Sequence, residues 1–251
     1  KIVKLSKEIG IYENPDELLS ISLGSTETTL LKLTSAYCSF VNGGKKINPK
    51  LIDRIQDSEG NTILKTEDRK CFNCENISFL SNELPKIKDD FKQIFSPQTA
   101  YQVTSILEGA TKTGTAKKLK DLKLDLAGKT GTTNKNTDTW FIGFTSDIVV
   151  GVYVGHDEPK SLGKFETGAK TAMPIFKSFI KEAVKKENTR PFKIPEKITL
   201  MVVDSKTGQK VNFASKKTII ESFKTVELKN NYDLNSKNNN RFSNNNVLRF
   251  Y

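Results

Sequence analysis

The stretch that most constrains the fold runs from Leu124 to Phe144 and reads LDLAGKTGTTNKNTDTWFIGF. Apolar and polar residues alternate through 124–129, which is the period of a strand buried on one face. The Asn-rich residues 133–137 suit a tight turn, and the apolar run Trp140–Phe144 follows that turn. The stretch therefore predicts a strand, a turn and a second strand.

The centre of this hairpin is Lys129-Thr130-Gly131, which Thr132 and Thr133 follow. A strand edge offers free backbone N–H and C=O groups to an extended peptide, and Gly131 has no Cβ to hold such a peptide away. Thr130 and Thr132 share one face of a regular strand, whereas Lys129 points to the other unless a twist or bulge re-aims it. Because two hydroxyls and a nearby cation can bind a carboxylate, we expect a carboxylate site here.

The tripeptide Lys-Thr-Gly occurs three times, at 112–114, 129–131 and 206–208. The first copy follows an amphipathic helix in a polar loop, and the third occupies the turn of a strand-turn-strand pattern. Only the middle copy lies between a strand and a second strand rich in aromatic residues. We therefore expect chemistry at the middle copy and turn formation at the other two. Asp138 and Trp140 in the second strand are interpreted as structural.

With its flanks, the middle copy resembles the third motif of the serine transpeptidases known as penicillin-binding proteins. Further segments are similar to class A, bifunctional members of that family, more closely those of Gram-negative bacteria, and they keep the family's order. These segments are Leu23–Ser25 through Ala36-Tyr37, Phe40–Gly44, Ser96–Tyr101, Gly128–Thr133, Asp138–Phe141 and Gly155–Gly163. Their joint occurrence makes the resemblance specific, although each segment alone would not.

The resemblance implies an α/β fold, namely part of the three-layer αβα sandwich with an antiparallel sheet found in penicillin-binding proteins and serine β-lactamases. It implies a peptidoglycan DD-transpeptidase that acts on D-Ala-D-Ala stem peptides, is acylated by β-lactams and uses no cofactor or metal. Lys129 would supply positive potential and a proton path, and the backbone N–H of Thr132 would be half of the oxyanion hole. Substrate binding would fall to Thr130, Gly131, Thr132 and Thr133, with the threonines 130 and 132 on the terminal carboxylate.

In this family the nucleophilic serine lies in Ser-x-x-Lys, and a Ser-x-Asn follows, both before the Lys-Thr-Gly strand. Here the matches Ser161–Lys164 and Ser178–Lys181 come after Lys129, and Ser-x-Asn occurs only within the Asn-rich residues 236–245. We interpret all of these as chance matches and expect no nucleophile in this chain, which would need the upstream part of the same domain. The alternative, favoured by the missing serine, is a non-catalytic truncated remnant or a cell-wall-interaction module.

Composition shifts divide the chain into a predicted domain, an extension and a tail. Residues 1–188 are expected to be the C-terminal part of the transpeptidase domain, with 66–95 as a surface insertion. Residues 189–228 are expected to form a small β-rich extension. A disordered tail is expected over 229–251, because the polar residues 229–246 cannot bury enough apolar surface to offset ordering.

Apolar periodicity predicts helices over Ile2–Ile9, from near Thr28 to Val41, from Pro97 to about Glu108, and over Pro174–Lys186. Residues 46–65 read as two strands around a turn. The third and fourth helices are expected to bury Tyr101, Val103, Ile106 and Leu107, and Ile175, Phe176, Phe179, Ile180, Ala183 and Val184. The nearly continuous apolar run 148–155 predicts a central strand of the sheet.

The net charge of +11 comes from 40 Lys+Arg against 29 Asp+Glu. Because the lysines are spread along the chain without a nucleic-acid motif, we interpret them as a solvated surface and expect no nucleic-acid partner. No apolar run approaches the roughly 18 residues that span a bilayer, so no membrane segment is expected in this chain. The resemblance implies the periplasmic side of the bacterial inner membrane, with any anchor upstream.

The three cysteines and the single histidine offer little for metal chemistry. Cys38 is expected to be a buried thiol of the second helix. Cys71 and Cys74 form C-x-x-C without a second pair or a nearby histidine, which argues against zinc and leaves a local disulfide or two free thiols open. His156 is interpreted as a structural or surface residue of a loop.

Overall fold

The computed structural model describes residues 1–66, 91–185, 187, 189–212 and 217–225, and the backbone of 71–72 and 86–87. The elements in chain order are α1 (Ile2–Ile9), η1 (Leu19–Leu23), α2 (Leu30–Val41), β1 (Arg54–Gln56), β2 (Thr62–Lys65), β3 (Cys71–Phe72), β4 (Lys86–Ile87), α3 (Pro97–Lys112), η2 (Lys117–Leu122), β5 (Ala127–Thr132), η3 (Asn134–Asn136), β6 (Asp138–Phe144), β7 (Val149–Gly155), α4 (Ala172–Ala183), β8 (Ile198–Asp204) and β9 (Thr218–Lys224). The predictions for the Cys71–Cys74 pair, for most of 66–95 and for the tail 229–251 fall outside the described residues.

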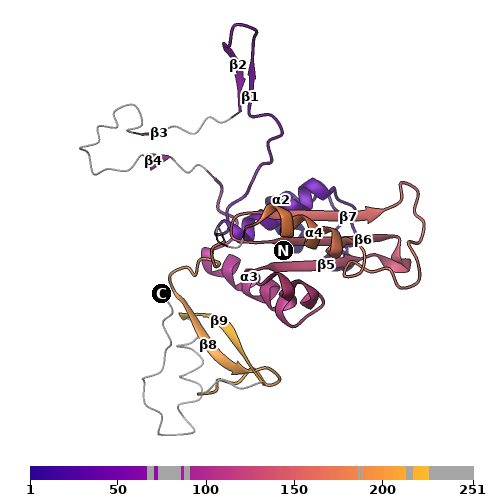
Figure 1. Cartoon of the computed structure of the whole chain (residues 1–251), viewed down its shortest axis with the longest axis vertical. Coiled ribbons are helices and arrows are strands. Elements are labelled where there is room, and N and C mark those ends of the chain that lie inside the picture. The colour runs from indigo at the N-terminus through magenta and orange to yellow at the C-terminus, as the bar shows by residue number, and fades with distance from the viewer. Residues whose placement is uncertain are drawn as a thin grey trace.

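The predicted hairpin around the middle Lys-Thr-Gly is confirmed as β5 and β6, which pair in an antiparallel three-stranded sheet with β7 (Figure 1). Thr130 lies opposite Phe141, which in turn lies opposite Val152. The register runs without a shift along β5 and β6, so side chains alternate regularly between the two faces of the sheet. The strand β5 begins at Ala127, three residues later than the alternation alone suggested.

Helices cover both faces of this sheet, which gives three layers. Phe141 contacts Phe176 of α4, with ring centroids 4.8 Å apart, and Phe144 contacts Tyr37 of α2, with ring centroids 6.4 Å apart. Because positions 141 and 144 of one strand point to opposite faces, α4 and α2 lie on opposite sides. The helix α3 joins the α2 layer, since the Thr104 hydroxyl donates to the Phe40 carbonyl at 3.3 Å.

The larger core lies between the sheet and the α4 layer, where η2 packs beside α4. Its buried members are Ala116, Leu119, Leu126, Phe141, Ala172, Met173, Phe176 and Ile180. The apolar side chains Val150, Val152 and Val154 of β7 pack against this cluster. Burial of this apolar surface is the main force that holds α4 and η2 on the sheet.

Among the described strands, 148–155 is not the central one, because β6 lies between β5 and β7. The run is apolar because both faces of β7 are covered. A Cβ on Gly151 would lie 3.0 Å from Leu30 of α2, whereas Val150 and Val152 face the α4 core. A continuous apolar run indicates that other elements cover both faces of a strand. It does not indicate whether the strand has neighbours on both of its edges.

The helix faces predicted to be buried are partly wrong. Ile106 of α3 is 65% exposed, and Ile175 and Phe179 of α4 are 52% and 47% exposed. The predicted stripe was wider than the one that meets the sheet, and α4 buries its Met173, Phe176 and Ile180 edge instead. The helix α3 runs to Lys112, beyond the predicted end near Glu108. The Cys38 thiol is half-buried rather than buried.

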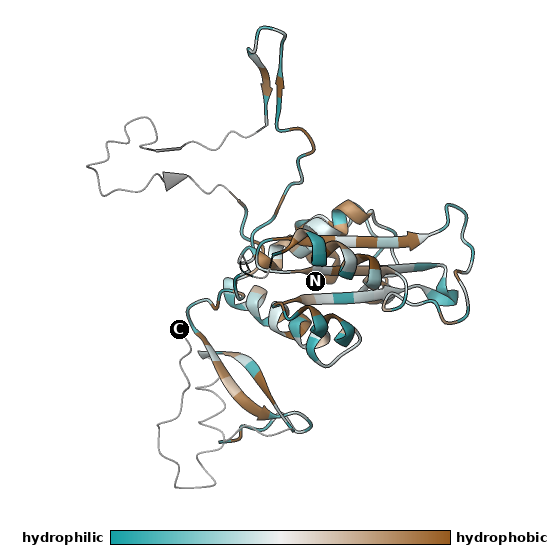
Figure 2. Ribbon diagram, in the orientation of Figure 1, coloured by the Kyte–Doolittle hydropathy of each residue, from teal (hydrophilic) through white to brown (hydrophobic). Residues whose placement is uncertain are grey.

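Three two-stranded sheets accompany this body, formed by β1–β2, β3–β4 and β8–β9. The predicted strand pair within 46–65 is confirmed as β1 and β2, whose residues are all exposed and project away from the main sheet (Figures 1 and 2). The pair β8–β9 lies against α3, where Gln102 Nε2 donates to the Ser222 carbonyl at 3.1 Å. Among the described helices, none combines the length and the apolarity needed to cross a bilayer.

Candidate active site

The middle Lys-Thr-Gly lies on β5, whose outer edge faces away from β6. The Thr133 N–H donates to the Asp138 carbonyl at 3.0 Å. Hydrogen-bonded pairs alternate along an antiparallel ladder, so Gly131 also bonds to β6 while the N–H and C=O groups of Thr130 and Thr132 point the other way. No other described strand pairs with that edge. The edge therefore offers backbone donors and acceptors to an extended ligand.

The Lys129 side chain ends at this same edge. Its Cβ belongs to the face opposite Thr130 and Thr132, as the alternation predicted. The ammonium nevertheless reaches the edge, because Nζ donates to the outward-pointing carbonyl of Thr130 at 2.8 Å. The flexible stem of an exposed lysine lets the charge cross from one face to the strand edge without a bulge. The cation and the free backbone groups therefore lie together.

The two threonine hydroxyls differ in their surroundings. Thr130 Oγ1 is 3.3 Å from Thr115 Oγ1 in the loop after α3. The exposed Thr132 accepts a hydrogen bond at its Oγ1 from the Gly168 N–H, at 3.1 Å. Both contacts are on the α4 face of the strand. Each hydroxyl therefore has one partner within the chain and keeps further hydrogen-bonding capacity.

Gly131 and Thr133 also have structural roles, and that of Thr133 lies in the turn predicted over 133–137. A Cβ on Gly131 would lie 3.2 Å from the Cβ of Trp140, so the missing side chain makes room for that residue across the ladder. Thr133 Oγ1 accepts from the Asp138 N–H at 2.8 Å and lies 2.7 Å from Thr137 Oγ1. The Thr133 hydroxyl thus closes the turn, and its predicted part in substrate binding stays a prediction.

Asp138, Trp140 and Tyr153 form one packed group beside the turn. The Trp140 and Tyr153 ring centroids are 4.8 Å apart, and the Tyr153 hydroxyl donates to Asp138 Oδ1 at 2.7 Å. This hydrogen bond, followed by some burial, raises the pKa of the Tyr153 phenol. A Cβ on Gly155 would meet the Tyr153 hydroxyl. These contacts are of the structural kind interpreted from the sequence for Asp138 and Trp140.

The other Lys-Thr-Gly copies are built into turns. Thr113 is the residue that ends α3, and its hydroxyl donates to the Gly109 carbonyl at 3.2 Å. Asp204 Oδ1 accepts from the Thr207 N–H at 2.9 Å and from its hydroxyl at 3.1 Å, and these bonds help lower the Asp204 pKa. Gly208 takes a φ of +68°, which suits glycine. These contacts agree with the predicted turn chemistry.

The two late Ser-x-x-Lys matches are also in ordinary surroundings. Ser161 lies in the loop after β7, where its Oγ accepts from the Gly163 N–H at 3.2 Å. Ser178 is exposed on the outer face of α4. Among the described residues, neither serine has a hydrogen bond to a lysine side chain, and His156 is exposed in the loop that holds Ser161. No group of three potential metal-ligating side chains gathers in the described part of the chain.

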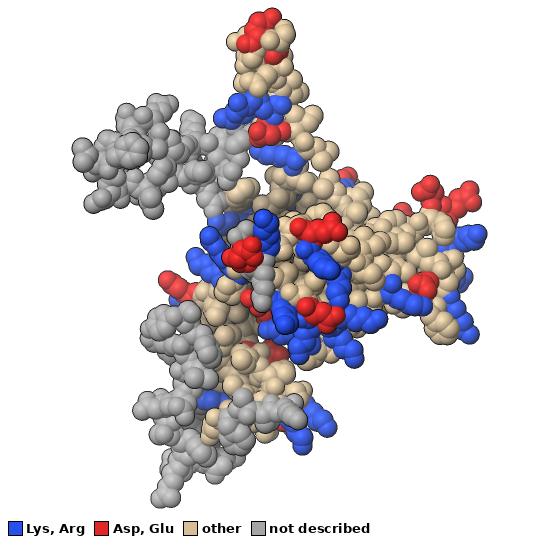
Figure 3. All heavy atoms as spheres, in the orientation of Figure 1, with Lys and Arg blue, Asp and Glu red and all other residues tan. Residues whose placement is uncertain are grey.

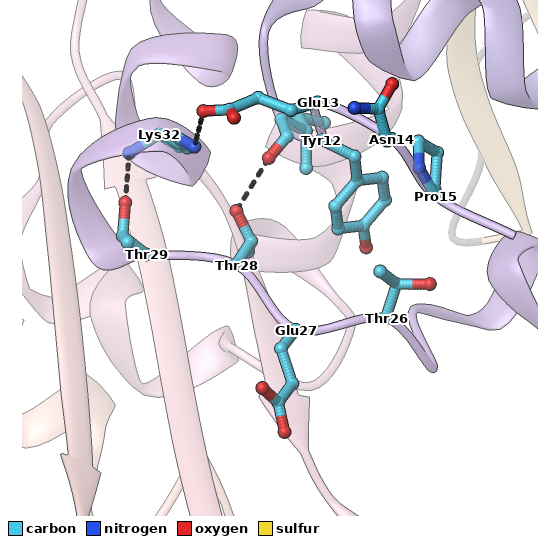
Figure 4. Close-up of a pocket in the computed structure, with 10 residues that line it drawn as sticks. Tyr12, Glu13, Asn14, Pro15, Thr26, Glu27, Thr28, Thr29 and Lys32 are labelled. Carbon is cyan, nitrogen blue, oxygen red and sulfur yellow. Dashed lines mark hydrogen bonds and ion pairs between the residues drawn. The ribbon is translucent and has the colours of Figure 1, made fainter.

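A cleft of about 390 Å³ lies away from this edge, between residues 11–15 and 26–32 (Figure 4). Lys32 Nζ pairs with Glu13 Oε1 across it at 2.7 Å, and this pairing lowers the Glu13 pKa. The Thr28 hydroxyl donates to the Ile11 carbonyl at 2.8 Å. The polar groups that line the cleft therefore already bond to one another and join its two segments. None of the Lys-Thr-Gly residues lines this cleft.

Sequence reasoning missed Gly168, Asn136 and Thr115. Gly168 and Asn136 belong to polar loops without an apolar period. Gly168 contacts Thr132, 36 positions earlier in the chain, and Asn136 contacts Gly163, 27 positions later. The available signal was the glycine at 168, in the loop before α4, because a glycine permits a close backbone approach. Nothing in the sequence marked Thr115 as the neighbour of Thr130.

A family model described as "Penicillin binding protein transpeptidase domain" matches residues 4–181. The chain is 43% identical over 228 residues to penicillin-binding protein 1A of Rickettsia prowazekii, covering 89% of this chain and 28% of that protein. It is 36% identical over 186 residues to penicillin-binding protein 1A of Neisseria gonorrhoeae, covering 72% of this chain and 21% of that protein. The chain thus spans less than a third of the length of these relatives.

Solved structures agree with this fold. Penicillin-binding protein 1A from Haemophilus influenzae matches with a TM-score of 0.72 and 28% identity, over 88% of this chain and 36% of that one. PonA1 from Mycobacterium tuberculosis matches with a TM-score of 0.57 and 19% identity, over 76% of this chain and 51% of that one. The three-layer αβα fold is confirmed, and the relatives agree with the predicted class A resemblance. The chain belongs to the penicillin-binding protein transpeptidase domain family.

Proposed function

We propose that this chain is the C-terminal part of a serine DD-transpeptidase that cross-links peptidoglycan stem peptides. The observation that carries the proposal is the open edge of β5, where outward-pointing backbone groups and the Lys129 ammonium lie together. Family membership supports the reaction type. An edge of this kind fits an extended peptide that ends in a carboxylate, because it combines backbone pairing with positive charge.

The reaction proceeds by acyl transfer in two steps. A serine oxygen bonds to the carbonyl carbon of the penultimate D-Ala, the C–N bond breaks, and the terminal D-Ala leaves with the proton on its nitrogen. An amine of a second stem peptide then attacks the ester and releases the serine. The Thr132 N–H, which points to the open edge, would be one donor of the oxyanion hole, and such a donor is worth roughly 10²–10³ in rate.

The remaining residues of the motif would hold and polarise the substrate. The Thr130 and Thr132 hydroxyls would bind the terminal carboxylate, with Gly131 and Thr133 lining the same stretch. Lys129 would supply positive potential and a proton path beside the nucleophile. Its present bond is to a neighbouring carbonyl, which a substrate strand can replace at little cost because that carbonyl also lies at the edge.

The nucleophile would come from the upstream part of the same domain, because no Ser-x-x-Lys precedes Lys129 in this chain. Exposed apolar side chains support docking of such a part. Leu18, Leu19 and Leu23, in and beside η1, are 60%, 93% and 90% exposed, which is unusual for neighbouring leucines of a finished surface. Along β7, the side away from β6 has no strand partner in the described part of the chain, so it could pair with an incoming strand.

We further propose that β-lactams acylate the protein that contains this chain and that it works on the periplasmic side of the inner membrane. The solved structure of PonA1 in complex with penicillin V supports the first point for a protein of the same fold. Penicillin carries a carboxylate next to its reactive amide, as the stem peptide does, so one edge can hold both. The location follows from the peptidoglycan substrate.

The experiment compares Thr→Val substitutions in the three Lys-Thr-Gly copies of the longer protein. Valine keeps the shape and strand propensity of threonine but has no hydroxyl. A hydrogen bond to a charged group is worth about 1.5–3 kcal/mol, so Thr132→Val is expected to slow second-order acylation by penicillin roughly 10- to 100-fold. Thr113→Val and Thr207→Val are expected to change the acylation rate little.

Equal losses in the three variants, with equal melting temperatures, would contradict the choice of the middle motif. The alternative, a non-catalytic remnant or wall-interaction module, rests on the missing Ser-x-x-Lys. It predicts that no penicillin adduct forms even in the longest protein made from the reading frame, whereas the transpeptidase predicts a covalent adduct on an upstream serine.

A further inference from the structure

The loop between β7 and α4 returns to the β5–β6 turn and touches the motif strand (Figure 1). We propose that residues 162–168 of this loop, here called the strap, fix the Thr132 hydroxyl as a hydrogen-bond donor to the ligand carboxylate. Gly168 and Asn136 would be the positioning residues. The inference rests on the proposed transpeptidase function and assigns a role to residues outside the Lys-Thr-Gly motif.

The contact between the strap and Thr132 decides whether the Thr132 hydroxyl acts as a donor or as an acceptor toward a ligand. The Gly168 N–H donates to Thr132 Oγ1 at 3.1 Å, and Gly168 is buried. A hydroxyl has one proton and two lone pairs, so an N–H on one lone pair leaves the proton free for an outside acceptor. An ionised carboxylate is only an acceptor. The strap therefore leaves the Thr132 hydroxyl as a hydrogen-bond donor, which is what a carboxylate acceptor needs.

Only glycine fits at position 168. A Cβ there would lie 2.4 Å from the Trp140 carbonyl oxygen and 2.6 Å from the Gly131 carbonyl oxygen. Both oxygens belong to the β5–β6 ladder, which cannot move aside without loss of pairing. The Gly168 carbonyl accepts from the Met173 N–H at 2.8 Å, at the start of α4. Position 168 thus holds the strap between the motif strand and the helix of the core.

Asn136 holds the other end of the strap. Its Nδ2 donates to the carbonyls of Gly163 and Lys164, each at 3.0 Å, and its own carbonyl accepts from the Leu162 N–H at 2.9 Å. Asn136 has a φ of +53°, a region that asparagine and glycine tolerate better than other residues. Three hydrogen bonds therefore join the turn to the strap, and they hold in place the segment that leads to Gly168 and its contact with Thr132.

Lys and Arg side chains are spread over the face seen in Figure 3. Within the loop, Lys170 Nζ pairs with Glu166 Oε1 at 2.9 Å, and the Glu166 N–H donates to the Gly163 carbonyl at 3.2 Å. The strap is thus folded on itself, and its orientation toward β5 depends on the Asn136 and Gly168 contacts.

The test uses the longer protein and two ligands, a penicillin and its methyl ester, whose carboxylate is blocked. Gly168→Ala forces the strap off the ladder, and Asn136→Gly removes the two side-chain donors while keeping the positive φ. Asn134→Gly is the matched control, because it makes the same exchange two residues earlier at an exposed position. Both test variants are expected to slow acylation by the penicillin about tenfold and to leave acylation by the ester unchanged. The control variant is expected to match the wild type with both ligands.

Equal slowing with the two ligands would mean that the strap is merely structural and would overturn the inference. So would an unchanged penicillin rate in Gly168→Ala and Asn136→Gly. A second measurement on residues 1–251 needs no activity: amide hydrogen exchange at Gly168 is expected to accelerate in Thr132→Val, and unchanged exchange would also refute the contact. Failure of the wild-type protein to react with penicillin would instead overturn the proposed function, and with it the inference.

Discussion

Substitution of Phe176 by alanine tests whether the α4 layer is held by the core described above. The Phe176 ring is fully buried, and its centroid lies 4.8 Å from that of Phe141. A Cβ on Gly143 would come within 2.6 Å of the ring, so the ring rests directly on backbone that cannot collapse into a cavity. Phe→Ala at such a site costs about 3–5 kcal/mol, and we expect a loss near the middle, about 4 kcal/mol.

Phe179 is the matched control, because the same helix carries the same residue type with 47% of its surface exposed. Half-burial of a Phe side chain is worth about 1 kcal/mol, so Phe179→Ala is expected to cost only that amount. In a domain of this size the difference corresponds to a melting temperature roughly 6–12 °C lower for Phe176→Ala. Urea unfolding, followed by far-UV circular dichroism, measures the free energy of unfolding of both variants, and thermal unfolding with the same signal measures their melting temperatures. Equal losses in the two variants would refute the assigned core face of α4.

Two further predictions concern reactivity and ionisation. Residues 1–251 alone are expected to form no covalent adduct with a fluorescent penicillin, and a labelled peptide containing Ser161 or Ser178 would show that the chance-match interpretation is wrong. The phenol of Tyr153 is expected to titrate above its ordinary pKa because of its hydrogen bond to Asp138, which absorbance titration of the wild type against Tyr153→Phe measures. Since folding raises this pKa, the contribution to stability is complete below the unfolded pKa of 10.0 and declines as the pH rises through the folded value. A titration at or below the ordinary value would contradict the hydrogen bond.

Local signals predicted much of the fold. The sequence carries such signals at the helix ends: Gly10 follows α1 and Asn42 follows α2. Ser96 precedes Pro97 at the start of α3, where the Ser96 hydroxyl accepts from the Thr99 N–H at 3.2 Å. These features depend on the residues next to them in sequence, so a single chain is enough to find them. The order of strands in the sheet depends on pairings between distant segments, and among the described strands the prediction of a central strand at 148–155 is not met.

The helix faces show the same limit. Phe176 and Phe179 both fit an apolar stripe, yet only Phe176 meets Phe141, because the sheet offers a narrow row of contacts to α4. A stripe in the sequence predicts which side of a helix turns inward, whereas the partner surface decides how much of the stripe is covered. Ile106 of α3 is exposed for the same reason.

The candidate site also has features that depend on neighbouring positions in the sequence and features that do not. Alternation correctly placed Thr130 and Thr132 on one face of β5 and the Lys129 Cβ on the other, since these depend only on neighbouring positions. The position of the ammonium at the edge could not be read from alternation, because a long side chain is free to leave the face on which it starts. An edge belongs to neither face, so the backbone groups of Thr130 and Thr132 and the charge of Lys129 can act on one ligand although their side chains begin on opposite sides. The proposed site therefore combines the edge of β5 with the face that carries the two threonine hydroxyls.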